Sequence, residues 1–233
     1  MSRLFLGSIL CVLTLVAVSA NAKMRPSVSE VFTSRAGFAT PDYTEANLQA
    51  ALEKYNHLQI PYPNLRTAVA KALQFFESNK TQFDNTKYIS VIDYTLSAKL
   101  PRFHIFELST GRVKSLHTAH GKGSDPDTDG FADRFSDISE SKMTSLGFLR
   151  TAETYYSEKF KSPALRMDGL SVSNQLARPR AIVIHGADYI QPEKGVVGRS
   201  WGCPALAQKI VQPVIDRIKG GSLILSWYGD DAN

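Results

Sequence analysis

Cysteine is nearly absent from this chain. Only two cysteines occur in 233 residues, and one of them, Cys11, lies in an apolar stretch at the amino terminus. If that stretch is removed, Cys203 stands alone and no intrachain disulfide can form. In an oxidising compartment a lone thiol is either buried and inert or reactive and functional. The scarcity of cysteine therefore excludes a disulfide scaffold and makes the surroundings of Cys203 the main question.

Other absences exclude whole classes of function. After the amino-terminal stretch, no apolar run approaches the roughly 20 residues that a transmembrane helix needs. The sequence contains no internal repeat, no low-complexity tract and no run of lysine or arginine. Its net charge of +5 therefore does not indicate a nucleic-acid partner, which a basic cluster would. A solvated surface, or attraction to an anionic polymer of the cell envelope, accounts for the basic balance.

Residues 1–22 have the pattern of a secretory signal peptide. Arg3 precedes an apolar run, and Ala20 and Ala22 occupy the small-residue positions that cleavage requires. We expect the mature protein to begin at Lys23. This pattern predicts export to the periplasm or cell envelope, with no stable membrane insertion after cleavage.

The remaining chain changes character near residue 84. Residues 23–84 begin with a lead-in that lacks periodicity and is expected to be mobile, followed by two amphipathic helices near 44–55 and 65–76. Thr44 is the expected N-cap of the first helix. Residues 85–233 are rich in β-branched and aromatic runs, which predict strands at 88–94, 102–108, 112–118, 181–185 and 222–228. The predicted class is α+β and β-rich, with a small N-terminal helical segment.

Cys203 lies in the stretch GRSWGCPAL, and an apolar pattern over 204–219 predicts a helix directly after it. Proline is favoured at the first position of a helix, which Pro204 would occupy. The positive end of the helix dipole would then lower the pKa of the Cys203 thiol. Backbone N–H groups from Trp201 through Cys203 would line an oxyanion hole, and Gly202 permits a sharp turn beside the sulfur.

A cysteine nucleophile needs a base that lies near it in space. Among the five histidines, His185 stands out because it ends the short apolar run AIVIH and is followed by Gly186. It precedes Cys203 by 18 positions. The other four histidines have ordinary structural explanations, so His185 is the candidate base.

Histidine followed by this cysteine block resembles the signature of the murein L,D-transpeptidases of the YkuD type. IVIHGADY (182–189) and GRSWGCPAL (199–207) carry the resemblance, and they fit a branch in which the block continues as Cys-Pro-Ala. The segments RFHIFELSTGRV, AHGKGS and SLGFLRTAETYY support it, so that it covers about residues 85–230. The resemblance implies a mixed β-sandwich with a helix after the catalytic cysteine, and a catalytic domain over 85–233.

The resemblance also implies roles for individual residues. Cys203 would be the nucleophile, His185 the base, and the backbone carbonyl of Gly186 the group that orients the imidazole. Ser200 and Gly202 match the family's block and would belong to the substrate and oxyanion site.

Two positions depart from the family's pattern. Trp201 stands where histidine is common, and Ala205 stands where many members carry arginine. Neither change removes the nucleophile or the base, but both bear on how the donor peptide and the acceptor are held. Arg199 is a candidate for the missing positive charge, and Trp201 is a candidate for contact with the donor.

The activity implied by the resemblance is a cysteine acyltransferase that acts on tetrapeptide stems of peptidoglycan and needs no cofactor. The cysteine attacks the third residue, expels D-alanine and forms a thioester, and an amine of another stem then gives a 3–3 cross-link. Water as acceptor would make the protein an L,D-carboxypeptidase, and a lipoprotein lysine or a D-amino acid would give anchoring or exchange. A non-enzymatic peptidoglycan-binding module is the alternative from another class.

Several rival families fit less well. In a sortase the histidine lies much further upstream, and in papain-like and amidase cysteine enzymes the cysteine precedes the histidine. A zinc site made of His185, Asp188 and Cys203 lacks a fourth ligand and paired-cysteine spacing. We therefore expect no metal in the site.

One further motif imitates the beginning of a calcium loop. DPDTDG (125–130) places aspartates at 125, 127 and 129 and glycine at 130, as in the first six positions of an EF-hand loop. The twelfth position is Ser136 instead of glutamate, and no helical pattern flanks the motif. The sequence therefore predicts a solvated acidic turn and no requirement for calcium.

Overall fold

The structure, a computed structural model, describes residues 25–229, so the predicted signal peptide lies outside the described residues. No helix of the described part has the length and apolarity of a membrane span. The α-helices are α1 (Val28–Phe32), α2 (Glu45–Lys54), α3 (Arg66–Ser78) and α4 (Val211–Ile218). The strands are β1 (Tyr88–Asp93), β2 (Phe103–Glu107), β3 (Val113–Leu116), β4 (Gly147–Ser157), β5 (Ser162–Gly169), β6 (Val183–Ala187), β7 (Ile190–Gln191), β8 (Val196–Val197), β9 (Ala205–Ala207) and β10 (Leu223–Trp227).

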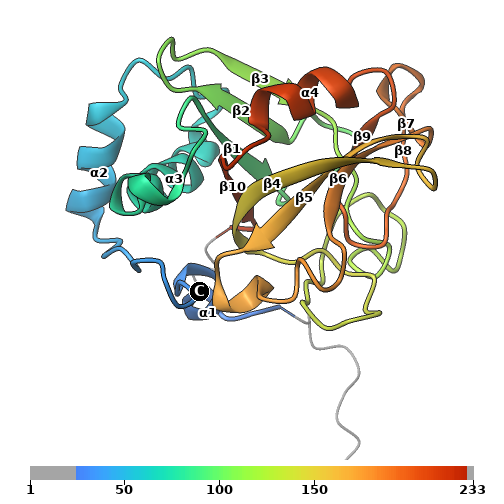
Figure 1. The fold of residues 1–233 in the computed structure, drawn as a ribbon, viewed down its shortest axis with the longest axis horizontal. Coiled ribbons are helices and arrows are strands. Elements are labelled where there is room, and N and C mark those ends of the chain that lie inside the picture. The colour runs from blue at the N-terminus through green and yellow to red at the C-terminus, as the bar shows by residue number, and fades with distance from the viewer. Residues whose placement is uncertain (1–24, 230–233) are drawn as a thin grey trace, which may run out of the picture.

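Eight strands form one mixed sheet in the order β3-β2-β1-β10-β4-β5-β6-β9 (Figure 1). The pairs β1–β10 and β6–β9 are parallel, whereas the other neighbours are antiparallel. Every residue of β10 is buried, as expected from its unbroken apolar run near the middle of the sheet. The β-rich α+β class predicted from the sequence is confirmed.

The sheet curls, so that the two layers expected of a sandwich are two halves of one sheet. Strand β4 carries a register shift between Thr151 and Thr154, and such a bulge increases the local bend and twist. Helix α4 packs against β1 of one half and against β5 and β6 of the other. This arrangement closes the sheet into a barrel-like core and places the short strand β9 at its far edge (Figure 1).

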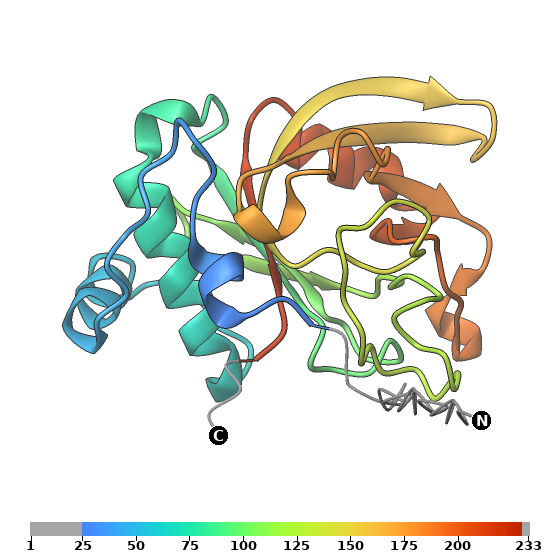
Figure 2. The same cartoon turned by 90° about the horizontal axis from the view of Figure 1, so that it is seen from below.

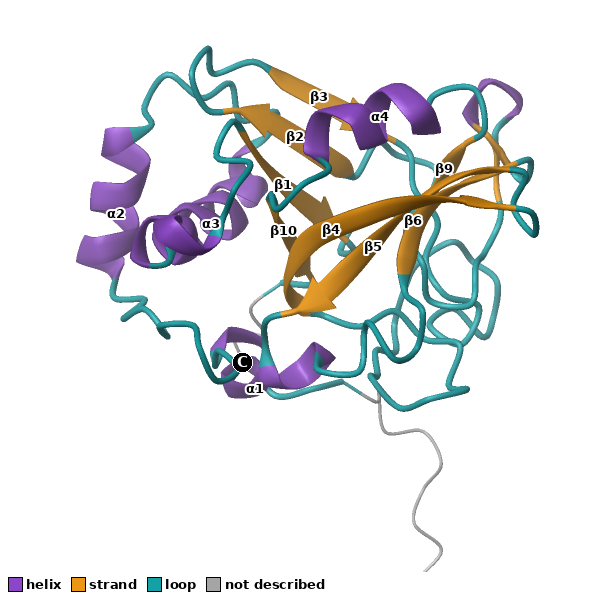
Figure 3. Cartoon of the chain, viewed as in Figure 1, coloured by secondary structure: helices purple, strands orange, loops and turns teal. Residues whose placement is uncertain are grey.

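Helix α3 covers the side of the sheet formed by β1 and β10, and α2 packs on the outside of α3 (Figure 3). Thr44 caps α2 as predicted, because its side chain accepts a hydrogen bond from the backbone N–H of Asn47 at 3.4 Å. The buried face of α3 belongs to the main core, where the ring of Phe75 stacks on that of Phe148 of β4 with centroids 3.9 Å apart. The helical segment is thus packed into the β-rich part, and the proposed division at residues 84 and 85 stays a prediction.

The expectation of a mobile lead-in is wrong for the residues from 25 onward. Ser27 and Glu30 form a capping box that starts α1. Phe32 is buried, with its ring 5.8 Å from those of Phe148 and Trp227. Figure 2 shows α1 lying against the body of the molecule. Helix α1 has only five residues, and two of them are buried. Such a short segment shows no helical periodicity in the sequence.

The helix predicted directly after Cys203 begins later than expected. Residues Ala205–Ala207 form β9, which pairs in parallel with β6, and α4 begins only at Val211. Because Ala205–Ala207 are all buried, their apolar sequence is compatible with a short buried strand as well as with a helix. Pairing with β6 decides between them. Cys203 therefore ends a turn that enters a strand, and no helix dipole acts on its thiol.

Candidate active site

The turn before Cys203 is fixed by its backbone. Gly202 has φ of +118°, and a Cβ atom there would lie 2.6 Å from the carbonyl oxygen of Met143. Only glycine fits this position. The hydroxyl of Ser200 accepts a hydrogen bond from the Gly202 N–H at 3.1 Å and lies 2.6 Å from the carbonyl oxygen of Cys203, to which it donates. These contacts set the direction in which the cysteine side chain leaves the turn.

Cys203 is 8% exposed and is the free cysteine of the described chain. Its Sγ accepts a hydrogen bond from the backbone N–H of Val183, at the start of β6, at 3.5 Å. Burial raises the pKa of the thiol, and this effect outweighs the opposing influence of the Val183 N–H and of the cations Arg180 and Lys159. The lowered thiol pKa predicted from a helix terminus is therefore wrong, because the thiol is desolvated and the helix lies elsewhere.

His185 lies in the middle of β6, not at the end of a strand as predicted, and it faces the same region. Its Nδ1 donates to the backbone carbonyl of Gly186 at 2.8 Å. A carbonyl can only accept, so this contact leaves Nε2 as the acceptor nitrogen. The ring of Phe160 stacks on the imidazole with centroids 3.6 Å apart. Burial lowers the pKa of His185, helped by the nearby charge of Lys159 and opposed by the Gly186 carbonyl.

Cys203 and His185 line one cavity of about 500 Å³. Burial disfavours the charged form of both groups, raising the thiol pKa and lowering the imidazole pKa. The resting pair is therefore a neutral thiol and a neutral imidazole. The remaining lining comes from Tyr155, Ser157, Lys159, Phe160, Arg180, Ala181, Ile182, Tyr189, Arg199, Ser200 and Trp201.

The backbone donors next to the sulfur differ from the prediction in one respect. The N–H of Gly202 is occupied by Ser200, so it is not available to an oxyanion. Within residues 25–229, no hydrogen bond uses the N–H of Trp201 or that of Cys203. These two groups remain as backbone donors in the turn, and they flank the occupied one.

The predicted substrate residues Trp201 and Arg199 form part of the rim. Trp201 is 60% exposed, and the Nζ atoms of Lys142 and Lys159 each lie 5.0 Å from the centre of its ring system. Arg199 lines the cavity and donates from Nη1 to the backbone carbonyl of Asp125. The rim is thus cationic and aromatic, which suits an anionic or amide-rich ligand.

The sequence did not point to three residues of this site. Lys159 and Phe160 come from the turn between β4 and β5, which folds over the ring of His185. Arg180 is buried beside the thiol, where its guanidinium donates to the carbonyl of Met143 at 2.8 Å and to the hydroxyl of Ser145 at 2.6 Å. Of the three, only Arg180 could have been found from the sequence. It directly precedes the apolar run AIVIH, and a charged residue next to a buried segment usually has a partner.

A second histidine supports the site from behind. Arg102 Nη2 donates to Nδ1 of His120 at 2.9 Å, so Nε2 carries the proton and donates to Asp125 Oδ2 at 3.1 Å. Burial lowers the pKa of His120 to about 3, with Arg102 and Arg199 acting in the same direction. The His120 carbonyl accepts from the N–H of Ser200 at 2.8 Å. His120 is therefore a structural residue of the kind predicted, and it anchors the turn that carries Cys203.

The acidic turn at 125–130 is not uniformly solvated. Asp127 and Asp129 are exposed as predicted, whereas Asp125 is buried against His120. The expectation of a solvated turn is therefore wrong for Asp125. Its hydrogen bond to a buried imidazole is a tertiary contact that the local composition does not reveal.

A cysteine and a histidine that share a cavity, with the imidazole oriented by a carbonyl, define the class of cysteine-dependent acyl-transfer sites. Residues 64–227, more than half of the chain, match the L,D-transpeptidase catalytic domain family. The chain belongs to this family, as the resemblance in its sequence indicated. A comparison with curated protein sequences finds no significant match.

Solved structures of L,D-transpeptidases are similar to this chain at low identity. One, bound to imipenem, is 15% identical over 60% of this chain and 59% of its own, with a TM-score of 0.36. An L,D-transpeptidase from Mycobacterium smegmatis is 14% identical over 60% and 58%, with a TM-score of 0.36. One from Stackebrandtia nassauensis is 14% identical over 82% of both chains, with a TM-score of 0.35. The chain thus spans about 60% of the first of these proteins, and the family assignment rests on the domain match.

Proposed function

We propose that this protein is an exported L,D-transpeptidase, a cysteine acyltransferase that forms 3–3 cross-links between peptidoglycan stem peptides. The observation that carries the proposal is the shared cavity of Cys203 and His185, in which the imidazole holds Nδ1–H on the carbonyl of Gly186 and so keeps Nε2 as its acceptor nitrogen. Export rests on the signal-peptide pattern of residues 1–22, whose cleavage would place the enzyme in the periplasm or cell envelope.

The first half of the reaction follows from the neutral resting pair. As Cys203 Sγ attacks the carbonyl carbon of the third stem residue, His185 Nε2 takes the thiol proton. The N–H groups of Trp201 and Cys203 stabilise the negative oxygen of the tetrahedral intermediate. When the intermediate collapses, the imidazolium returns the proton to the nitrogen of D-alanine. D-alanine leaves, and the acyl group remains on the sulfur as a thioester.

The second half runs the same steps in reverse with a new nucleophile. The amine of another stem attacks the thioester carbonyl and gives its proton to His185, and the thiol leaves after it is reprotonated. Water, a lipoprotein lysine or a free D-amino acid would complete the same cycle with other products. The stacked ring of Phe160 holds the imidazole in one plane during both halves, so the base need not reorient between them.

The test is incubation of the purified protein with tetrapeptide muropeptides and separation of the products by mass. We expect release of D-alanine together with a dimer that contains a 3–3 bond. Tripeptide as the sole product would make the protein a carboxypeptidase instead. If neither D-alanine nor any new product is formed, while the protein binds the muropeptide, the peptidoglycan-binding alternative would replace the enzyme.

Export is tested separately by amino-terminal sequencing of the protein recovered from the cell envelope. The expected first residue is Lys23. Recovery of residues 1–22 still attached, in the membrane fraction, would mean that the apolar stretch is an anchor.

A further inference from the structure

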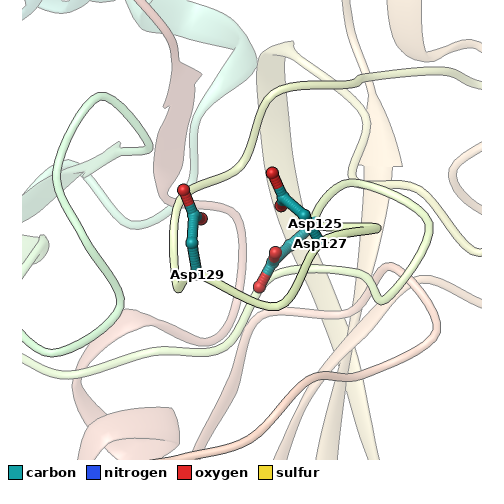
Figure 4. A group of neighbouring side chains, drawn as sticks. All are labelled: Asp125, Asp127 and Asp129. Atoms are coloured by element: carbon teal, nitrogen blue, oxygen red, sulfur yellow. The ribbon is translucent and has the colours of Figure 1, made fainter.

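Three carboxylates gather in the loop that joins β3 to β4, behind the active site. One oxygen from each of Asp125, Asp127 and Asp129 lies within 4.8 Å of the others, and Figure 4 shows the three side chains around a common space. Calcium binds oxygen ligands at about 2.3–2.6 Å, so two ligands on opposite sides of one ion stand about 5 Å apart. The three oxygens are therefore close enough to bind a single ion.

The loop has the conformation that its spacing requires. In an EF-hand loop, positions 1, 3 and 5 supply side-chain ligands and position 6 is a glycine that makes a sharp turn. Here Gly130 stands at the sixth position with φ of +95°. The N–H groups of Gly130 and Phe131 donate to Asp125 Oδ2 at 3.3 Å and to Asp129 Oδ1 at 2.8 Å. The chain thus presents the carboxylates without the flanking helices of an EF-hand.

Asp125 supplies an observation that points to a ligand independently of the cluster. The residue is 1% exposed, and its Oδ1 atom is buried without a hydrogen-bond partner among the described residues. Its other oxygen, Oδ2, accepts from His120 at 3.1 Å and from the N–H of Gly130 at 3.3 Å, so these contacts leave Oδ1 unsatisfied. A buried carboxylate oxygen without a partner is strongly unfavourable unless an ion or a donor contacts it.

Arg102, a cation behind the loop, donates to His120 and is linked by hydrogen bonds to Asp125 through that ring, so it does not neutralise the two outer carboxylates. Within the described chain, neither Asp127 nor Asp129 forms an ion pair, and both are exposed to solvent. Arg199 approaches the loop at the backbone carbonyl of Asp125, not at its carboxylate. Three negative groups that are close together repel one another, and a divalent cation removes this repulsion.

We propose that Asp125, Asp127 and Asp129 bind one calcium ion. An open loop with all-oxygen ligands suits Ca²⁺, which accepts irregular geometry, better than Mg²⁺, which requires a near-ideal octahedron and keeps its waters. The proposal goes against the expectation, drawn from the missing glutamate at position 12, that calcium is not required. The hydrogen bond from His120 fixes the carboxylate of Asp125 in the loop, and water would supply the ligands that a twelfth-position glutamate supplies in an EF-hand.

The ion would stabilise the turn that carries the nucleophile. Asp125 accepts from Arg199 through its backbone carbonyl and from His120 through its carboxylate, and the His120 carbonyl binds the N–H of Ser200. Ser200 in turn holds the carbonyl of Cys203. A chain of direct hydrogen bonds thus joins the acidic loop to the catalytic turn, so binding of the ion should raise the stability of both.

The experiment is calorimetric titration of the purified, chelator-treated protein with CaCl₂, with MgCl₂ as a parallel arm, together with melting curves in both salts. The test variants are Asp127→Asn and Asp129→Asn, because both residues are exposed and their replacement leaves the packing of Asp125 intact. Asp42→Asn, an exposed acid in the segment before α2, is the matched control for the loss of one surface charge.

We expect wild type and Asp42→Asn to bind one equivalent of Ca²⁺ and to melt at a higher temperature in its presence. Each test variant should bind Ca²⁺ about tenfold or more weakly, a loss of at least about 1.4 kcal/mol per ligand. Equal binding by the test variants and the control would overturn the proposal, as would the absence of saturable binding. Tighter binding of Mg²⁺ than of Ca²⁺ would overturn the assignment of the ion. None of these readouts depends on transpeptidase activity.

Discussion

The floor and the rim of the active-site cavity are built in different ways. On the floor, Cys203 and His185 are buried and each has a fixed backbone partner, Val183 N–H for the sulfur and the Gly186 carbonyl for the ring. On the rim, Trp201 is mostly exposed, and the flexible side chains of Lys142 and Lys159 form cation–π contacts with its ring. The floor is preorganised for bond making, whereas the rim is adaptable, which suits the selection of a ligand.

The largest effect should come from the nucleophile. Cys203→Ala removes the attacking atom, and Cys203→Ser replaces it with a hydroxyl that is far less ionised, so neither variant should form a thioester. Mass spectrometry after incubation with a carbapenem should show an adduct on the wild type and none on Cys203→Ala. Both variants should fold, as no disulfide depends on this residue. Release of D-alanine by Cys203→Ala would refute the assignment of the nucleophile.

The base comes next. His185→Ala should lower the rate of D-alanine release by about 100- to 10,000-fold, the usual contribution of a general base. The sulfur remains in place, so slow acylation by a carbapenem should persist. A melting curve close to that of the wild type would show that the loss is catalytic. A fall of less than tenfold would assign the base to another group.

The pH profile distinguishes a neutral pair from a thiolate–imidazolium pair. The pKa of His185 is lowered from 6.5, so the base stays unprotonated down to below that pH, and kcat/KM should fall only on the acid side of 6.5. The thiol pKa is raised from 9.0, so alkylation by iodoacetamide should accelerate only above about that pH. Rapid alkylation that is constant down to pH 5 would instead demonstrate a preformed thiolate.

On the rim, smaller and more selective effects are expected. Trp201→Ala removes a large exposed contact surface without touching the sulfur or the base. Loss of this aromatic contact should cost about 1.4 kcal/mol of binding free energy. The KM for the muropeptide should therefore rise about tenfold. Acylation by a carbapenem, which is much smaller, should change less. Equal losses for both ligands would place Trp201 in the chemical step.

The smallest change is expected for Lys159→Gln. The positive charge of Lys159 lowers the pKa of both His185 and Cys203. Its removal should shift the acid limb of kcat/KM toward higher pH, as the imidazolium form becomes easier to populate. Lys142 contacts Trp201 in the same way as Lys159 but does not affect the pKa of His185. The matched control is therefore Lys142→Gln. Identical shifts in the two variants would contradict this role of Lys159.

Local signals in the sequence predicted several features that the structure confirms. Thr44 caps α2 because capping needs only a hydroxyl three residues before a free N–H. The strands at β1 and β10 were visible as apolar runs because both are buried on two faces. The long strands β4 and β5 were not predicted as strands, because exposed residues interrupt the second half of β4 and the charged Arg166 and Asp168 interrupt the apolar pattern of β5.

The proposed catalytic pair was predicted from residue types and their order, whereas its protonation state was not. The order of His185 and Cys203 and the glycine before the thiol are local facts. The pKa of the thiol depends on what covers it. A periodic pattern after Cys203 predicted a helix terminus, but pairing of β9 with β6 buried the sulfur instead.

The sequence by itself determined the family and the glycine that the turn requires, and it supplied the proposed nucleophile and base, since each depends on the chemistry of one residue and its chain neighbours. Only the tertiary structure decided that Phe160 stacks on the base, that Arg180 lies beside the thiol, and that Asp125 is buried in an otherwise exposed loop. The first two contacts join residues more than 20 positions apart, and the third depends on how the loop from His120 to Asp125 folds back on itself. They depend on the curl of the sheet, which no local pattern encodes, because desolvation and electrostatic coupling arise only when distant segments pack together.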